Sequence, residues 1–229
     1  MEELAVTKKV LDIKVTDKRL SPDEVVAQAF SFIVGGFFTS ADILAHCGYE
    51  LALNAHIERK LYDEIIGAAV DGDIPYDQLS QLPYLDAFLS EIMRHHASPL
   101  PLSRYPVTDC KLSGTDIVVR AGTQIEIPLY AIHHSDEFYE SPWKFDPDRF
   151  MPENKHQIRP YTFLPFGAGP RNCIGMRFAL LVIKLALAHI IRRYRLYRTD
   201  DTDVPLQYKR KYNATRPKQV IVGIERRPD

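Results

Sequence analysis

The chain has 229 residues, of which 45% are hydrophobic and 26% are charged, and its 29 basic and 30 acidic side chains give a formal net charge of −1 at pH 7. This is the composition of an ordinary globular protein, and its near-zero charge gives no reason to expect nucleic acid or an anionic membrane as a partner. The three cysteines are odd in number and far apart, which argues against a disulfide framework or a zinc site and favours a reducing compartment.

The first 41 residues contain no segment with the pattern of a signal peptide or a membrane span. Residues 1–19 alternate charges with short apolar pairs and lack an apolar core. Residues 29–41 are nearly apolar, but about a dozen residues fit a buried core helix better than a span of ~20 residues. We therefore expect neither a signal peptide nor a transmembrane segment in this chain.

A long helix is predicted over residues 21–54. It opens with a capping box, in which Ser21 is the N-cap, Pro22 the first helical residue and Glu24 the N3 residue. Because this helix is apolar on most faces, we expect it to run through the middle of a domain.

Two more helices are expected before the chain changes character. The first covers residues 55–70 and ends at Asp71-Gly72-Asp73, and the second covers residues 84–96 and is stopped by Pro99 and Pro101.

Short strands and a long loop follow. Residues 117–119 and 124–127 are β-branched segments around Ala121-Gly122 and predict a hairpin. Residues 135–165 predict an ordered meander, because seven of their aromatic side chains need burial: Phe138, Tyr139, Trp143, Phe145, Phe150, Tyr161 and Phe163. A final helix over residues 174–193 and a closing strand at 220–222 complete a mainly α fold with small β-sheets, in the α+β class.

The segment Phe166-Gly167-Ala168-Gly169-Pro170-Arg171-Asn172-Cys173-Ile174-Gly175 lies at the start of the final helix. Its glycines permit close approaches that a Cβ would forbid, so that a flat macrocycle could lie against the loop. Cys173 is expected at the helix N-terminus, where unpaired N–H groups and the positive end of the dipole favour thiolate over thiol. The alternative is a buried structural thiol.

This decapeptide resembles the haem-binding loop of the cytochrome P450 family. The resemblance implies that Cys173 is the axial ligand of the iron of haem b, and a thiolate ligand favours O–O cleavage at that iron. It also implies that the cofactor-binding loop includes Phe166, Gly167, Gly169 and Gly175.

Glu91 and Arg94 lie three residues apart on one helical face. Without the cysteine loop, a surface ion pair would be the better interpretation. In the family, the same spacing resembles the Glu-x-x-Arg motif, whose buried pair is joined by a third arginine, here Arg149, in a structural role that suits the planar guanidinium. Arg171 and Arg104 resemble the contacts to the haem propionates, which are costly to bury without a cation.

Residues 33–40 resemble the distal helix signature of the family, which runs small residue, Gly, any residue, acid, Thr. Gly36 and Thr39 match it and would border the oxygen site. The Cys173 sulfur is then expected to face the Gly35-Gly36 region of this helix across a gap wide enough for a porphyrin. Phe38 stands where the family has the acid, and a phenyl ring cannot relay protons. Thr39 could instead be a helix residue bonded to its own backbone, and Phe38 a core aromatic.

The resemblance covers residues 1–229 but only the carboxy-terminal half of a family member. The resemblance implies that the chain is a partial haem domain. This domain would contain a long distal helix (21–54), a Glu-x-x-Arg helix (84–96), a meander (135–165), a cysteine loop (166–175) and a proximal helix (174–193). The chain is most similar to the animal members that handle xenobiotics. This likeness implies a parent protein on the cytosolic face of the endoplasmic reticulum membrane, with a membrane anchor that we expect to be absent from this chain.

The implied activity is that of a haem-thiolate monooxygenase, here a fragment, that inserts one atom of dioxygen into a lipophilic small molecule with electrons from NADPH through NADPH-cytochrome reductase. Two alternatives stay open. A haem-thiolate isomerase or dehydratase is favoured by Phe38, and a non-catalytic product of a truncated gene is favoured by the missing half. None of the eight histidines shows the spacing of metal ligands.

Overall fold

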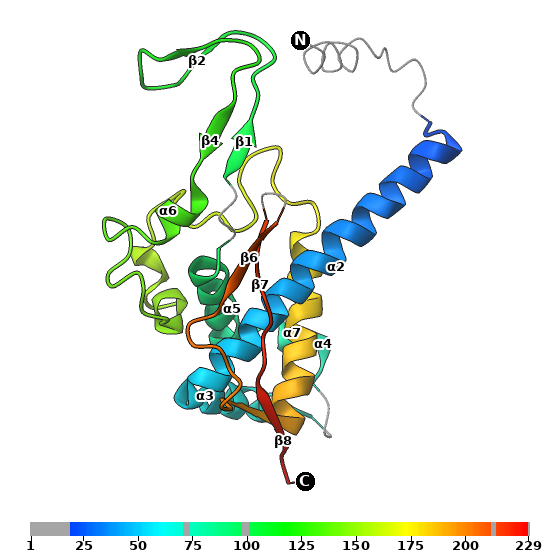
Figure 1. Cartoon of the computed structure of the whole chain (residues 1–229), viewed down its shortest axis with the longest axis vertical. Helices are drawn as coiled ribbons and strands as arrows, with labels where there is room; N and C mark the ends of the chain where they lie inside the picture. The colour runs from blue at the N-terminus through cyan, green and yellow to red at the C-terminus, as the bar shows by residue number, and fades with distance from the viewer. Residues whose placement is uncertain (1–18, 71–73, 98–100, 212–213, 229) are drawn as a thin grey trace. The chain divides into compact units, whose positions relative to one another are not determined.

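The computed structural model describes residues 19–70, 74–97, 101–211 and 214–228. The expectations for residues 1–18, for the helix end at 71–73 and for Pro99 lie outside these residues. The chain divides into two compact units, residues 1–38 and 39–229, and each is described by itself. The described residues are mainly helical and form four two-stranded antiparallel sheets (Figure 1), which confirms the predicted α+β class.

Helix α2 (Pro22–Leu53) begins where the sequence predicts. The Ser21 N–H donates to Glu24 Oε2 at 2.7 Å and the Glu24 N–H donates to Ser21 Oγ at 3.3 Å, so both arms of the capping box are formed. The prediction of a helix buried along its length is wrong, since the buried residues of α2 lie between His46 and Ala52. Val26 and Phe30 are 69% and 67% exposed. An apolar pattern in the sequence predicts that a helix face packs against another surface, but it does not show that such a surface is present.

The apolar part of α2 is longer than the sequence analysis expected. Among the described helices, α2 alone has an 18-residue window apolar enough to cross a membrane, with a mean hydropathy of 1.4. Only the length and the composition of α2 mark it as a helix that could cross a membrane. Core helices of water-soluble folds can have the same length and composition.

The core of the 39–229 unit lies among the end of α2, α3 (Ala55–Gly67), α5 (Pro83–His95) and α7 (Met176–Arg193), with the short α4 (Tyr76–Leu79) beside them. These helices supply the apolar side chains that are buried most completely, among them Leu51, Ile57, Leu61, Ile65, Leu85, Phe88, Leu89, Ile92, Leu187 and Ile191. The helices predicted over residues 55–70 and 174–193 therefore exist with slightly shorter bounds, and the helix predicted over 84–96 exists one residue earlier in the chain.

Glu64 of α3 caps the start of α5. Its two carboxylate oxygens accept the N–H groups of Tyr84 and Leu85 at 2.7 and 2.9 Å. These N–H groups have no partner within their own helix, so the carboxylate both satisfies them and stabilises the positive end of the helix dipole.

The strands pair differently from the prediction. The sheets are formed by β1 (Leu102–Arg104) with β4 (Ile125–Ile127), β2 (Cys110–Lys111) with β3 (Val118–Val119), β5 (Tyr194–Tyr197) with β8 (Gly223–Arg226), and β6 (Tyr208–Lys211) with β7 (Ala214–Pro217). The hairpin predicted between residues 117–119 and 124–127 is therefore wrong. The Gly122 N–H donates to the Pro106 carbonyl at 2.8 Å, so the chain at this turn pairs backward with earlier residues. The closing strand begins at Gly223, just after the predicted 220–222.

The meander is ordered, as predicted, and contains two 3₁₀ turns, η1 (Pro147–Phe150) and η2 (Lys155–Gln157), after the short α6 (Leu129–His133). Tyr139 and Phe150 are buried, and the Tyr139 hydroxyl donates to the Thr162 carbonyl at 3.1 Å. Two of the aromatics expected inside are exposed, Trp143 by 65% and Tyr161 by 76%. An aromatic side chain can rest on a surface, and Trp143 lies against His134 with ring centroids 4.4 Å apart.

Candidate haem-thiolate site

The cysteine loop closes on itself just before α7. The Cys173 N–H donates to the Phe166 carbonyl at 2.9 Å, which brings the two ends of the loop together. Gly167 and Gly169 have φ angles of +70° and +80°, a conformation that side chains with a Cβ rarely adopt. The backbone path of the loop therefore favours glycine at these two positions. Gly175 is the N-cap of α7, so Cys173 lies two residues before that cap.

The residues around Cys173 are open to solvent. Cys173 is a free, exposed thiol, and Ile174 and Phe178 are 87% and 69% exposed, as are the polar residues Arg171, Asn172 and Arg177 to a large extent. A Cβ built on Gly169 or Gly175 would meet no described atom within 4 Å. A soft sulfur donor on an open surface with space beside its glycines, exposed apolar side chains and nearby arginines is what a flat macrocycle with a central iron and anionic propionates requires, so these residues fit a haem. The alternative of a buried structural thiol does not agree with this exposure.

The two arginines expected at the propionates lie on different elements. Arg171 is an exposed residue of the cysteine loop. Arg104 ends β1, where it is half-buried and donates from Nη1 to the Ser103 carbonyl at 2.9 Å. Their pairing with propionates remains a prediction.

Glu91 and Arg94 form a fully buried, bidentate ion pair. Arg94 Nε lies 2.7 Å from Glu91 Oε2 and Arg94 Nη2 lies 2.8 Å from Oε1, and both side chains are 0% exposed. Burial raises the pKa of the Glu91 carboxyl, and the hydrogen bonds from Arg94 oppose that rise. The interpretation of an exposed surface pair is therefore wrong.

The meander completes this cluster. Arg149 Nε lies 3.6 Å from Glu91 Oε1, and the Asp146 N–H donates to the same oxygen at 2.8 Å. Arg94 also donates from Nη1 to the His133 carbonyl at 2.7 Å, so that one buried pair connects α5 with α6 and with η1. We expect this connection to stabilise the relative positions of α5, α6 and η1, and so to support the cysteine loop that follows the meander.

His133 is not among the site residues predicted from the sequence. Its Nε2 accepts the Leu164 N–H at 3.1 Å, which joins α6 to the end of the meander two residues before the cysteine loop. Its side chain is 0% exposed, and burial lowers its pKa from 6.5 to about 4. The histidine pair at 133 and 134 is the only signal for this contact in the sequence, and it does not reveal a partner 31 residues away.

Gly36, Phe38 and Thr39 all lie in α2, as predicted. Gly36 and Thr39 are three residues apart and so share a helix face. Gly36 belongs to the unit of residues 1–38, whereas Thr39 and Cys173 belong to the other unit. The predicted approach of Cys173 to Gly36 across a porphyrin-wide gap stays a prediction.

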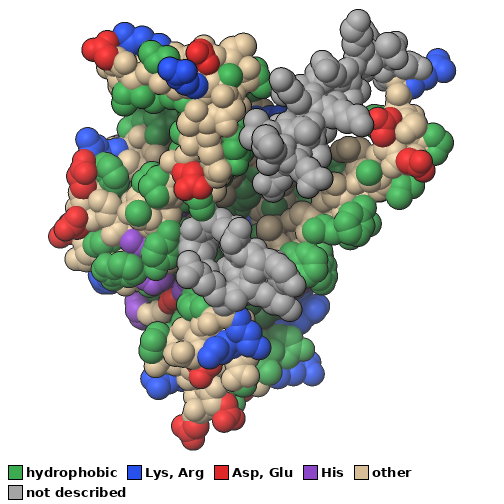
Figure 2. Space-filling model, turned by 45° about the horizontal axis from the view of Figure 1, so that its top comes forward, with side chains coloured by type: hydrophobic (Ala, Val, Ile, Leu, Met, Phe, Trp, Pro, Cys, Tyr) green, Lys and Arg blue, Asp and Glu red, His purple; other side chains and the backbone are tan. Residues whose placement is uncertain are grey.

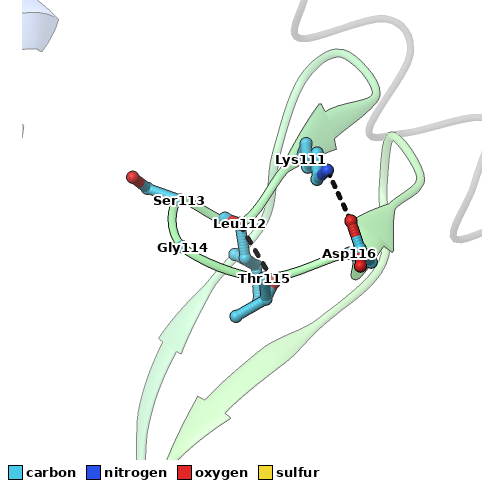
Figure 3. A pocket seen from close by; sticks show the side chains of 6 residues that line it. All are labelled: Lys111, Leu112, Ser113, Gly114, Thr115 and Asp116. Carbon is cyan, nitrogen blue, oxygen red and sulfur yellow. Dashed lines mark hydrogen bonds and ion pairs between the residues drawn. The ribbon is translucent and has the colours of Figure 1, made fainter.

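A separate hollow lies under the turn between β2 and β3 (Figure 3) and is lined by residues 111–116. Lys111 Nζ donates to Asp116 Oδ1 at 2.8 Å and Thr115 Oγ1 donates to the Leu112 carbonyl at 3.0 Å, so the polar groups of this turn satisfy each other. It is the concave side of an exposed turn and shows no catalytic grouping.

Comparison with known proteins shows the family of the chain. The sequence profile described as Cytochrome P450 matches residues 3–223, so the chain belongs to the cytochrome P450 family. It is 43% identical over 211 residues to "Probable cytochrome P450 6a14" of Drosophila melanogaster, an alignment covering 90% of this chain and 42% of the relative.

Two other relatives have similar sequence identities to this chain. The identity is 38% to "Cytochrome P450 9e2" of Blattella germanica and 37% to "Cytochrome P450 3A31" of Mesocricetus auratus, covering 90% and 92% of this chain and 39% and 42% of those relatives. These relatives come from insects and a rodent, which confirms the likeness to animal members. The chain spans about two-fifths of the length of the curated relatives that it matches.

Proposed function

We propose that this chain forms the haem-thiolate side of a monooxygenase that inserts one oxygen atom of dioxygen into a lipophilic small molecule. The observation that carries the proposal is the exposed Cys173 thiol, held at the start of α7 by a glycine-containing loop with an open surface. Membership of the cytochrome P450 family supports it. When bound, the haem would supply the activation of dioxygen, a chemistry that no side chain provides.

Each residue then has a defined task. Cys173 would hold the iron through its thiolate, and Phe166, Gly167, Gly169 and Gly175 would form the loop surface that lies along the macrocycle. Arg171 and Arg104 would neutralise the propionates, which pair well with the planar guanidinium group. The buried ion-pair cluster of Glu91, Arg94 and Arg149 would keep the loop in place without contacting the reacting atoms.

The distal side has one unusual position. Gly36 would leave room for a bound small molecule, and the Thr39 hydroxyl can both donate and accept a hydrogen bond near it. Phe38 can do neither, so no carboxylate delivers protons from this position of α2. Loss of general acid–base assistance typically lowers a rate by ~10²–10⁴-fold. We therefore expect this chain to turn over slowly.

Phe38 also favours a second candidate. A haem-thiolate isomerase or dehydratase rearranges a substrate that already carries its oxygen, and this reaction needs no delivery of protons to dioxygen. In both cases we propose a lipophilic small molecule as the substrate, which would lie on the side of the haem that faces Gly36 and Thr39.

The partner and the location follow from the monooxygenase proposal. Electrons would come from NADPH through NADPH-cytochrome reductase, and the cytosolic face of the endoplasmic reticulum is the proposed location. The likeness to animal family members supports a role with foreign lipophilic compounds as substrates.

The test is a product assay on the haem-loaded 229-residue chain with reductase, NADPH, isotopically labelled dioxygen and a panel of lipophilic compounds. The proposal predicts products carrying one labelled oxygen atom, formed only when NADPH and reductase are present. Phe38→Glu should raise the product formed per NADPH consumed, and Phe37→Glu is the matched control. Rearrangement of lipid peroxides without reductase, with no labelled product, would instead support the isomerase.

A further inference from the structure

A second polar cluster lies within the 39–229 unit, where the end of α2 meets the end of α5 and the segment that leads into β6. These elements enclose an open hollow of about 560 Å³. Glu50, His95 and His96 line it, and one ligand atom from each lies within 4.8 Å of the other two. Histidine side chains gather in one area of the face that Figure 2 shows. No part of the haem-thiolate mechanism uses these three residues.

His96 is the best placed of the three. Its Nε2 lies 2.7 Å from Glu50 Oε1 and its Nδ1 lies 3.5 Å from the Tyr208 hydroxyl, and the side chains of Glu50 and His96 are 6% and 7% exposed. A metal ion between Nε2 and the carboxylate would replace one proton. The Nδ1–H could then donate to the Tyr208 oxygen, the kind of outer contact that orients most metal-bound histidines.

His46 lies beside this cluster. Its Nδ1 donates to the Asp42 carbonyl at 2.8 Å, which leaves the lone pair on Nε2. The ring is 3% exposed, and its Nε2 has no hydrogen-bond partner among the described residues. It stacks on His96 with ring centroids 4.3 Å apart, so a buried and unsatisfied acceptor lies against the cluster.

The neighbouring charges permit a cation. Arg94 Nη2 lies 3.4 Å from His95 Nδ1, but both of its forked donors are already paired with the Glu91 carboxylate. His95 is the last residue of α5 and His96 its C-cap, and the C-terminal end of a helix carries partial negative charge.

We propose that Glu50, His95 and His96 form a binding site for a divalent transition metal ion, with zinc as the ion that fits best. Two imidazoles and one carboxylate are a recurrent ligand set for zinc, which holds them at about 2.0–2.2 Å. At those distances tetrahedral ligand atoms lie roughly 3.3 Å apart. His96 Nε2 and Glu50 Oε1, now 2.7 Å apart, would therefore separate slightly, and the His95 ring would turn to join them. Sequence spacing misses the site because its ligands come from two helices, with Glu50 more than 40 residues before the histidine pair.

The site is tested with cobalt(II) as a spectroscopic probe for zinc. Titration of the 229-residue chain should show one equivalent of cobalt with the visible absorption of a low-symmetry site, and zinc should displace it. Glu50→Gln and His96→Phe should each lower cobalt affinity at least tenfold. The matched control His156→Gln, at an exposed histidine, should leave affinity unchanged. Circular dichroism of each variant shows that it is folded.

A second measurement does not depend on the variants. Zinc should raise the midpoint of thermal unfolding of the unaltered chain, because a ligand that binds only the folded state stabilises it. Cys173→Ser should keep the cobalt site, which separates this proposal from the haem proposal. Absence of a one-equivalent site in the unaltered chain, or equal affinity in the chain and in both ligand variants, would overturn the inference.

Discussion

Glu91 shows what a single residue does in this fold. Its two oxygens accept from Arg94 and from the Asp146 N–H, and Arg149 lies close to one of them. A buried ion pair adds little net stability over an apolar pair, but removal of one partner leaves a charge without compensation. The importance of Glu91 is therefore best measured by neutralising it.

Glu91→Gln should lower the free energy of unfolding by ~3–5 kcal/mol, because it leaves the Arg94 charge buried without its carboxylate. Denaturant unfolding measures this change. Glu137→Gln is the matched control, since Glu137 pairs with Arg159 at the surface, where both side chains are more than half exposed. That change should cost about 1 kcal/mol or less. Equal losses in the two variants would contradict the cluster's role.

The buried histidines predict a loss of stability in acid. The pKa of His133 is about 4 in the folded chain against 6.5 for a free imidazole. Between these values the unfolded chain binds the proton and the folded chain does not, so stability falls as the pH falls. For one such group the slope is about 1.4 kcal/mol per pH unit.

His133→Gln should reduce that slope between pH 6.5 and about pH 4, whatever it does to absolute stability. The measurement is the unfolding free energy across this window. His156→Gln, at an exposed site, should leave the slope unchanged. A slope unaltered by His133→Gln would show that His133 is already protonated in the folded state.

Among the elements, α5 has the central position. It packs against α3 and η1, it receives the Glu64 cap, and it carries the Glu-x-x-Arg pair. Its apolar face is almost completely inaccessible to solvent, with Leu85 and Phe88 both 0% exposed. Stability should therefore depend more on α5 than on the exposed strands.

Leu85→Ala should cost ~2–5 kcal/mol, since it removes buried apolar atoms and leaves a cavity. Leu112→Ala, the same exchange in the exposed β2–β3 turn, should stay within about 0.5 kcal/mol. Thermal or denaturant unfolding distinguishes the two. Similar losses would mean that the core does not lie around α5.

The helices were predictable because their signals are local. The Ser21 cap and the 3.6-residue period define where helices begin and which faces are apolar. The strand pairs were not predictable, since β3 and β4 pair with strands earlier in the chain that the sequence pattern did not mark. The Glu91–Arg94 contact followed from spacing, but the contacts with Asp146 and with the His133 carbonyl depend on tertiary approach.

On the scale of the whole molecule, we expect the exposed apolar side chains in the first part of α2 to determine whether the purified chain self-associates. Phe30, Ile33 and Phe37 are 67%, 68% and 67% exposed in the described structure. Contiguous exposed apolar side chains favour association. We therefore expect a chain that presents such a helix to self-associate.

Replacing both Phe30 and Ile33 by Ser should lower the associated fraction of the purified chain, because it removes apolar surface from α2. Analytical ultracentrifugation over a concentration series measures that fraction. Gln28→Ser, a polar exchange in the same helix, is the control. An unchanged distribution would assign the association to another surface.

The central claim is that Cys173 holds a haem iron through its thiolate, and a carbon monoxide difference spectrum of the haem-loaded chain tests it most directly. The account predicts the long-wavelength band of thiolate-ligated haem. Cys173→Ser should abolish this band, and Cys110→Ser, at a half-buried cysteine, should keep it. A band that survives in Cys173→Ser, or its absence from the unaltered haem-loaded chain, would contradict the account.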